Sequence, residues 1–155
     1  MKRIGVVSDS HGDRGHLQQA LMKMEAGGKL DCVIHCGDGG RDAEALTGHI
    51  MQTIIVKGNN DGWSCPYDEG KLLPIGKATF FITHGHRFGV KNDLYTLADA
   101  AVAKGAQVVC FGHTHIPYCG YLQGVLMVNP GSCAFTSRGA VITVDDRGEI
   151  TAELI

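Results

Sequence analysis

Short apolar runs alternate with segments of helical periodicity in the first third of the chain. Residues 3–8, 31–36 and 53–57 hold consecutive apolar positions, which predict buried strands with both faces covered. Between them, segments 13–27 and 42–48 place apolar residues at helical spacing. This β-α-β-α-β alternation predicts a parallel sheet with right-handed crossovers.

The pattern becomes mostly strand-like after residue 66. The predicted elements are strands 70–75 and 77–83 joined at Gly76, a helix starting near Asn92 and ending at Gly105, a strand over 107–111, a hairpin over 117–128 and a terminal hairpin turning at 145–148. The helix should bury one stripe, formed by Leu94, Leu97, Ala98, Ala101 and Val102. We therefore expect an α/β fold of two stacked, mainly mixed β-sheets flanked by helices, a four-layer α/β/β/α sandwich, as a single domain over residues 1–155.

Charge and hydropathy argue against two classes of partner. The 155 residues carry a net charge of −2 and contain no lysine or arginine run, so we expect no binding to duplex nucleic acid. No apolar stretch approaches the roughly 20 residues of a membrane span, so we expect a cytoplasmic protein with no membrane partner. The six cysteines show no CxxC spacing, and we expect them to be reduced.

Polar side chains that can bind metals follow five of the predicted strands. They are Asp9 with His11, Asp38, Asn59 with Asp61, His84 with His86, and His113 with His115. In open α/β sheets, ligands bind outside the carboxyl ends of the strands, and two histidines at i and i+2 can face one cavity. Carboxylates, neutral imidazoles and an amide oxygen together suit divalent first-row metals. The pattern thus predicts a metal site at these strand ends.

The sequence resembles the calcineurin-like metallophosphoesterase superfamily, in particular its small bacterial and archaeal phosphodiesterase group. Five motifs carry the resemblance, and they are Asp9-x-His11, Gly37-Asp38, Gly58-Asn59-x-Asp61, His84-Gly85-His86 and Gly112-His113-x-His115. Each motif is common by itself, but all five occur here in the family's order and at comparable intervals. The resemblance extends from Asp9 to the turn at residues 129–132.

The resemblance also implies a ligand set and a reaction. One divalent metal would be held by Asp9, His11, Asp38 and His115, and a second by Asp38, Asn59, His84 and His113. The ligand types favour Mn²⁺ or Fe, with Zn²⁺ and Ni²⁺ as alternatives. The implied reaction is two-metal hydrolysis of a small organic phosphodiester, with a bridging hydroxide as nucleophile. The residues expected at the reacting centre are Asp38, Asn59, His84 and His86; for His86, a substrate contact and a structural role stay open.

One position departs from the superfamily's pattern. Asn60 stands where the wider superfamily usually has a histidine that can protonate the leaving oxygen, and an amide has no transferable proton at neutral pH. We therefore expect good turnover only of substrates such as aryl diesters, whose leaving group needs no proton. In the surrounding loops, Trp63 and Tyr67 are either pocket walls or loop packing, Arg138 is a candidate phosphate contact, and Asp61 is expected to orient its loop.

Other functions stay open on the same fold. A phosphomonoesterase, a protein phosphatase or a cyclic-nucleotide phosphodiesterase could use the same site, and the eukaryotic retromer subunit resembles this fold yet mainly holds partner proteins. All seven expected ligands are present here, which favours an enzyme over a scaffold. His16, His35 and His49 lie outside the motifs and are expected to be structural or solvated. The sequence leaves the natural substrate, the native metal and the oligomeric state, including a homo-oligomer, undetermined.

Overall fold

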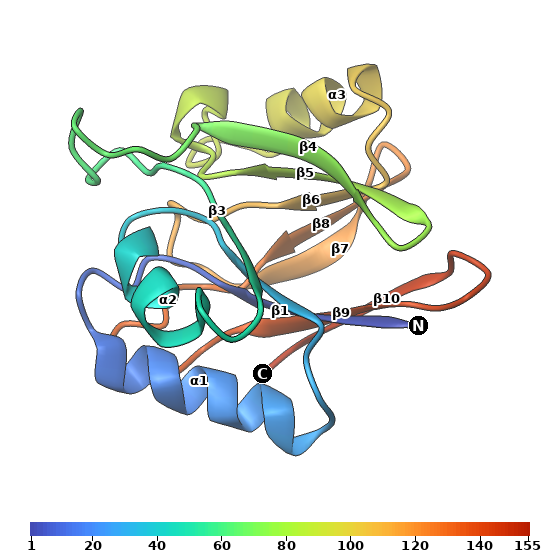
Figure 1. Ribbon diagram of the computed structural model, residues 1–155. Coiled ribbons are helices and arrows are strands. Elements are labelled where there is room, and N and C mark those ends of the chain that lie inside the picture. The colour runs from blue at the N-terminus through green and yellow to red at the C-terminus, as the bar shows by residue number, and fades with distance from the viewer.

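Two five-stranded sheets stack face to face, and helices cover both outer faces (Figure 1). The computed structural model describes residues 1–155. The first sheet contains, in spatial order, β10 (Ile150–Leu154), β9 (Ala140–Val144), β1 (Lys2–Val7), β2 (Cys32–His35) and β3 (Gln52–Ile55). The second contains β4 (Gly70–Ile75), β5 (Ala78–Thr83), β6 (Val108–Cys110), β8 (Val125–Asn129) and β7 (Tyr118–Leu122). This arrangement confirms the predicted α/β/β/α sandwich.

Both sheets are mixed, with parallel strands in their interior. β1, β2 and β3 run parallel, while β9 and β10 join antiparallel to them. In the second sheet β5, β6 and β8 run parallel, and β4 and β7 are antiparallel edge strands. Side chains that follow β1 and β5 approach one another, so the carboxyl ends of the parallel strands of both sheets meet at one edge of the sandwich.

The helices lie where the apolar periodicity placed them, with shifted ends. α1 (Arg14–Ala26) and α2 (Gly40–Thr47) cover the first sheet, and α3 (Tyr95–Ala103) covers the second (Figure 1). Asp13 caps α1 by accepting a hydrogen bond from the backbone N–H of His16. α3 is shorter than predicted, because residues 89–93 form turns before it. Val102 is 51% exposed, since it lies at the edge of the buried stripe.

Three layers of apolar side chains fill the spaces between these elements. Ile4, Phe80 and Ile142 belong to the core between the two sheets. Leu17 packs in the layer beneath α1 and α2, and Leu97 in the layer beneath α3. The sequence pattern did not predict the short 3-10 helix η1 (His86–Phe88), which interrupts the chain after β5.

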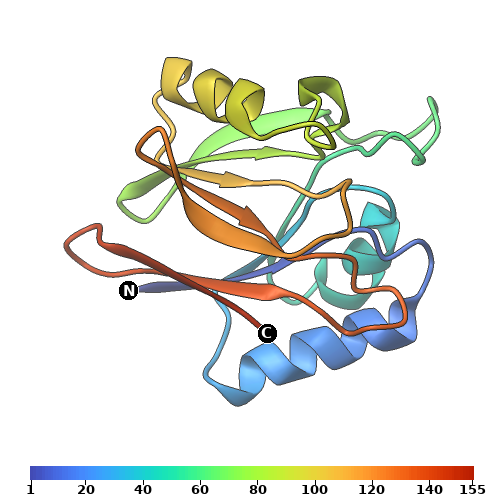
Figure 2. The same ribbon diagram turned by 180° about the vertical axis from the view of Figure 1, so that it is seen from behind.

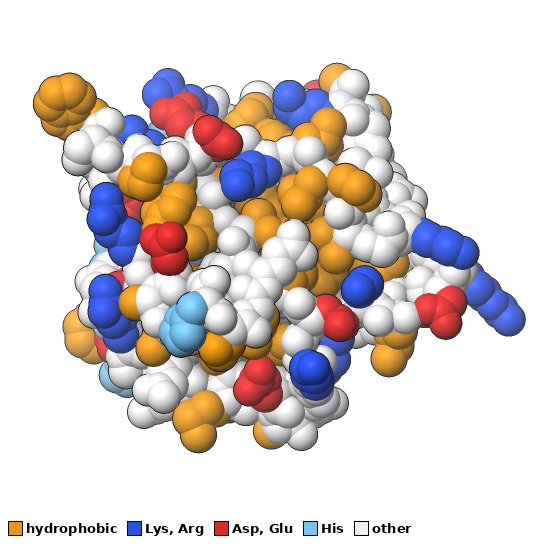
Figure 3. All heavy atoms as spheres, viewed as in Figure 1, with side chains coloured by type: hydrophobic (Ala, Val, Ile, Leu, Met, Phe, Trp, Pro, Cys, Tyr) orange, Lys and Arg blue, Asp and Glu red, His pale blue; other side chains and the backbone are white.

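Three further observations concern the cysteines, the length of the helices and the charge of the surface. All six cysteines are free thiols, and burial raises the pKa of Cys133 to about 12. None of the helices has the length and apolar content that a membrane span requires. On the face seen in Figure 3, basic and acidic side chains are interspersed, and no continuous basic patch forms.

Candidate metal centre

Six of the seven predicted ligands come together where the parallel strands end. Asp9 and His11 follow β1, Asp38 follows β2, His84 follows β5, and His113 and His115 follow β6. Oδ1 of Asp9 lies 3.1 Å from Nε2 of His115. The same oxygen lies 3.8 Å from Nε2 of His11 and 3.8 Å from Nε2 of His84. Asp9 is thus the centre of the group.

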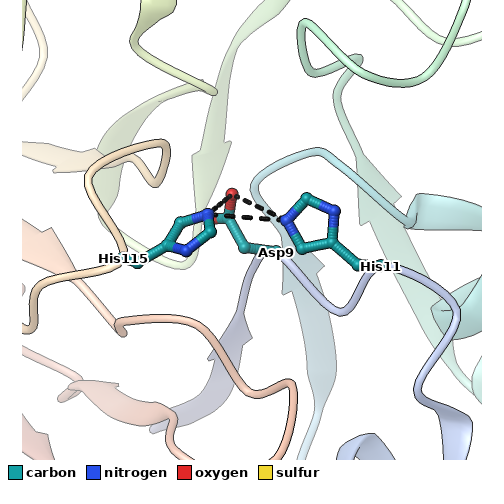
Figure 4. Close-up of side chains that lie close together, drawn as sticks. All are labelled: Asp9, His11 and His115. Carbon is teal, nitrogen blue, oxygen red and sulfur yellow. Dashed lines mark hydrogen bonds and ion pairs between the residues drawn. The ribbon is translucent and has the colours of Figure 1, made fainter.

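The first cluster consists of Asp9, His11 and His115, whose side chains point toward one another from two different sheets (Figure 4). The Nε2 atoms of the two histidines are 3.4 Å apart. Both imidazoles are partly exposed, whereas Asp9 is fully buried. One carboxylate and two imidazoles at this spacing form a donor set typical of divalent transition metals.

The second cluster consists of Asp9, Asp38 and His84, all buried. Oδ2 of Asp38 lies 3.3 Å from Nε2 of His84 and 4.0 Å from Nε2 of His11. The two clusters therefore share Asp9, while Asp38 lies between His84 of one and His11 of the other. This position is compatible with the bridging role that the family resemblance implies for Asp38.

Hydrogen bonding fixes which nitrogen of His84 faces the carboxylates. Nδ1 of His84 lies 2.7 Å from the carbonyl oxygen of Cys36, so it carries the proton and donates it. In the neutral ring, Nε2 then presents a lone pair toward Asp9 and Asp38. Nε2 of His84 and Oδ1 of Asp9 are both buried without a hydrogen-bond partner. Buried polar atoms are rarely left unpaired, and a cation between these two would satisfy both, so the residues fit a metal ion.

The electrostatics of the cluster keep Asp38 ionised. Burial raises the pKa of Asp38, but the neighbouring imidazole of His84 and the two donors of Asn60 outweigh burial and hold that pKa well below its usual range. Burial also lowers the pKa of His84, and here the carboxylates of Asp38 and Asp9 reverse the effect and raise it. The ionised carboxylate of Asp38 is ready to bind a metal, whereas the raised pKa of His84 favours its protonated ring, so metal binding would release that proton.

The backbone is strained at five of the predicted ligands. Left-handed φ angles occur at Asp9 (54°), His11 (48°), Asp38 (58°), His113 (71°) and His115 (63°). Such conformations cost a non-glycine residue about 1–3 kcal/mol and concentrate at functional sites, where the surroundings impose them. Only three other non-glycine residues of the chain share this conformation. The strain turns each ligand toward the common centre.

A glycine allows the two sheets to approach each other at the centre. A Cβ on Gly112 would collide with Oγ of Ser8 and with Oδ2 of Asp9. The backbone of this turn also binds the ligand group, because the N–H of His113 donates to Oδ2 of Asp9 over 3.2 Å. The close approach therefore requires glycine at position 112.

Asp61 ties together the turns after β2 and β3, in agreement with its predicted role. Its carboxylate accepts hydrogen bonds from the backbone N–H groups of Asp38 (2.9 Å), Gly39 (2.8 Å) and Gly58 (2.7 Å). These three bonds fix the backbone that carries Asp38. Asp61 thus acts on the metal centre through the position of another residue.

A buried hydrogen-bond network around Ser10 lies beside the centre, and little in the sequence indicates it. Nδ1 of His35 accepts from the N–H of Gly37 (3.1 Å), so its Nε2–H donates to Oγ of Ser10 (2.9 Å). Ser10 in turn donates to Oδ2 of Asp42 (2.7 Å), which also accepts from the N–H of Gly12 (2.9 Å). Burial lowers the pKa of His35 to about 4, so the ring is neutral. The one signal was a histidine inside an apolar run.

The side chain of Asn59 makes no hydrogen bond to either cluster. Asn59 is exposed and makes no side-chain hydrogen bond, so its ligand role stays a prediction. Its neighbour Asn60 binds Asp38 instead, with its N–H 2.8 Å from Oδ1 and Nδ2 2.9 Å from Oδ2. An amide at position 60 therefore positions the carboxylate, a role that the sequence comparison alone did not suggest.

His113 and His86 lie at the rim of the second cluster. The ring of His113 is 5.1 Å from the ring of His84, and the ring of His86 is 5.5 Å from it. Nδ1 of His86 is buried without a partner. Burial, assisted by the nearby His84, lowers the pKa of His86, so this imidazole is neutral at pH 7. His86 is close enough to the centre to contact a bound substrate.

The structure places the loop aromatics and Arg138 in different surroundings. Tyr67 donates a hydrogen bond to Glu44 on α2, which supports the loop-packing alternative for this residue. Trp63 is 95% exposed at the tip of the same loop. Arg138, in contrast, borders a hollow of about 400 Å³ that His11 and His115 also line.

Comparisons with known proteins agree with this geometry. The probable metallophosphoesterase YsnB of Bacillus subtilis is 36% identical over 148 residues, which cover 91% of this chain and 83% of that protein. The phosphodiesterase MJ0936 of Methanocaldococcus jannaschii is 31% identical over 154 residues, with 84% of each protein covered. The crystal structure of Vps29 from Entamoeba histolytica complexed with Zn²⁺ matches with a TM-score of 0.75 over 99% of this chain and 98% of that chain.

The Vps29 match has 19% sequence identity and therefore shows the fold alone. The family assignment comes from a different match, that of the family model for the calcineurin-like phosphoesterase superfamily domain to residues 1–146. It confirms the resemblance carried by the five motifs. The chain therefore belongs to the calcineurin-like phosphoesterase superfamily.

Proposed function

We propose that the chain is a phosphodiesterase that hydrolyses small organic phosphodiesters with two divalent cations. Membership of the superfamily makes it a metal-dependent phosphoesterase. The single observation that carries the proposal is a pair of buried atoms without a hydrogen bond, Oδ1 of Asp9 and Nε2 of His84, which lie 3.8 Å apart among carboxylate and imidazole groups. The relative MJ0936 is named a phosphodiesterase, which supports the diester as substrate.

Two overlapping sets of residues would hold the cations. One cation would be held by Asp9, His11, Asp38 and His115, and the other by Asp38, Asn59, His84 and His113, so that both sets include Asp38. When bound, divalent cations activate a water molecule for attack on phosphorus and neutralise charge on the phosphoryl oxygens. Mn²⁺ or Fe fits the mixture of carboxylates and imidazoles best, and Zn²⁺ and Ni²⁺ are alternatives.

The ligand residues would also set the charge of the site. The two buried carboxylates, Asp9 and Asp38, contribute −2, which leaves the loaded centre positive and attractive to an anionic phosphate. A hollow of about 310 Å³ opens beside Asp38, lined by His11, Gly12, Asp38, Gly39, Asn60 and Asp61. The four side chains among these residues are all polar, so the hollow suits a phosphate group once cations are bound.

The chain offers little help to a poor leaving group. Asn60 has no proton to transfer and its amide is held by Asp38, so it supplies no general acid. The neutral imidazole of His86 can donate a hydrogen bond but is a weak acid. These features favour diesters with a phenolate leaving group over those with an alkoxide leaving group.

The test is metal-restored hydrolysis of a p-nitrophenyl phosphodiester and the matching monoester. Protein stripped with a chelator is re-supplied in turn with Mn²⁺, Ni²⁺, Zn²⁺ and Mg²⁺. We expect diester cleavage to return with metal, to exceed monoester cleavage and to be absent in Asp38→Ala. A faster monoester reaction would favour a phosphomonoesterase. No turnover despite bound metal, measured by elemental analysis, would favour a protein-binding scaffold.

A further inference from the structure

A second hollow borders the metal centre on the side of the loop between β8 and β9. It has a volume of about 400 Å³, and its lining consists of His11, His115, Ser132, Ala134, Phe135, Thr136 and Arg138. Two of these residues belong to the metal centre, and the others belong to residues 132–138, which we call the β8–β9 loop. This loop runs beside the start of α1 (Figure 2). A molecule bound at the centre can therefore extend along the loop.

Phe135 presents its ring to solvent from a strained backbone. Phe135 is 85% exposed, and its backbone φ angle is 62°. A left-handed φ is an outlier for a bulky residue, and the exposed ring has one aromatic neighbour, the imidazole of His16, whose centroid lies 6.1 Å away. Outside the predicted ligands, only Phe135, Ser137 and Gln123 share this conformation. Left-handed backbone conformations thus occur in the β8–β9 loop as well as at the predicted ligands.

Hydrogen bonds fix the β8–β9 loop relative to the centre. Oγ of Ser132 donates to the carbonyl oxygen of Asp9 over 2.7 Å. The N–H of Phe135 donates to Oδ2 of Asp13, the cap of α1, over 3.0 Å. Oγ of Ser137 lies 2.9 Å from Oε1 of Gln19 on the same helix. These three bonds hold the start, the middle and the end of the segment, so the backbone that carries Phe135 keeps a set position beside the predicted metal ligands.

Arg138 supplies an unpaired positive charge to the same hollow. Its side chain is exposed and makes neither a salt bridge nor a hydrogen bond with the protein. A guanidinium group presents a planar fork of donors that matches phosphate oxygens. An aromatic ring and a free guanidinium therefore line the same hollow as two of the predicted metal ligands, and together these groups have the chemistry to bind an aromatic ring joined to a phosphate.

We propose that Phe135 and Arg138 form the substrate-recognition site of this enzyme, and that its substrates are phosphoesters carrying an aromatic ring such as a nucleobase. The ring stacks on Phe135, and Arg138 donates hydrogen bonds to the phosphate. The proposal rests on the proposed function, because it names the substrate class of the same centre.

The experiment compares the binding of AMP and ribose 5-phosphate to the Mn²⁺-loaded protein by isothermal titration calorimetry. The two ligands share a phosphate and a ribose, and only AMP has an aromatic ring. Stacking of a base on an aromatic side chain corresponds to about tenfold or more in affinity, so AMP should bind about tenfold tighter. Phe135→Ala should remove this preference, and Phe135→Trp should keep it. Arg138→Gln should weaken both ligands by a similar factor.

Two exposed residues that do not line this hollow serve as matched controls. Tyr121→Ala removes an exposed aromatic ring and Arg147→Gln an exposed cation, and neither should change the binding of either ligand. The proposal is overturned if wild-type protein shows no preference for AMP, if Phe135→Ala retains it, or if Arg138→Gln binds both ligands normally. The readout is a binding ratio, so a chain that prefers AMP but hydrolyses no diester would refute the proposed function alone.

Discussion

At the scale of single residues, Asn60 shows how one side chain can serve the metal centre and limit its chemistry. Its amide and backbone N–H donate to both oxygens of Asp38 and help to keep that carboxylate ionised. The same amide cannot protonate a leaving group. Asn60 thus holds the predicted ligand Asp38 in place but supplies no general acid.

Asn60→His should therefore widen the range of substrates. A histidine at this position can carry the proton that an alkoxide needs, and general acids contribute about 10²–10⁴-fold to such steps. We expect kcat/KM for an alkyl-leaving diester to rise at least about tenfold relative to that for an aryl-leaving diester. Asn60→Gln, which keeps an amide, is the control and should not change the ratio. An unchanged ratio in Asn60→His would remove this explanation of specificity.

At the scale of elements, the turns after β2 and β3 depend on each other through Asp61. Its carboxylate receives three backbone N–H groups from the two turns, including that of Asp38. Residues that hold a ligand in place are commonly as important to a metal site as the ligand itself.

Asp61→Ala should loosen Asp38 and weaken metal binding. Loss of such supporting contacts typically lowers metal affinity about 10–100-fold. The measurement is the dissociation constant for Mn²⁺, determined by competition with a chelator, together with a circular dichroism spectrum to check the fold. Asp68→Ala removes an exposed carboxylate from the same connection and should bind Mn²⁺ normally. Equal affinities in the two variants would show that Asp61 does not support the centre.

The elements also show what the sequence could and could not predict. Buried strands were recognisable because their apolar positions are consecutive, and six of the predicted ligands that the structure brings close together each follow such a strand. Local sequence signals did not predict the features that depend on contacts between distant segments. The chain turns before α3, η1 forms after β5, and Tyr67 binds Glu44, none of which has a signal in its own segment. The His35 network was missed for the same reason, since its partners lie far apart in the sequence.

At the scale of the whole molecule, the metal centre joins the two sheets of the sandwich. Asp9, His11 and Asp38 come from the first sheet, whereas His84 and His115 come from the second. Bound cations would therefore add to the contacts between the sheets, which are the apolar core and hydrogen bonds such as those of His84 to Cys36 and of His113 to Asp9. A ligand that binds only the folded state stabilises it, by about 2.7 kcal/mol at a concentration 100 times its dissociation constant.

Metal should thus raise the melting temperature at pH 7.5 and lose this effect below about pH 6, because the imidazole ligands must be neutral to bind. Acid also destabilises the metal-free protein. The pKa of buried His35 is about 4 when folded and near 6.5 when unfolded, so the unfolded chain takes up the proton first, and stability falls as the pH drops between these values. The difference between Mn²⁺-loaded and chelator-treated protein at each pH cancels this contribution. A difference that persists unchanged at pH 5 would show that the histidines do not bind the stabilising metal.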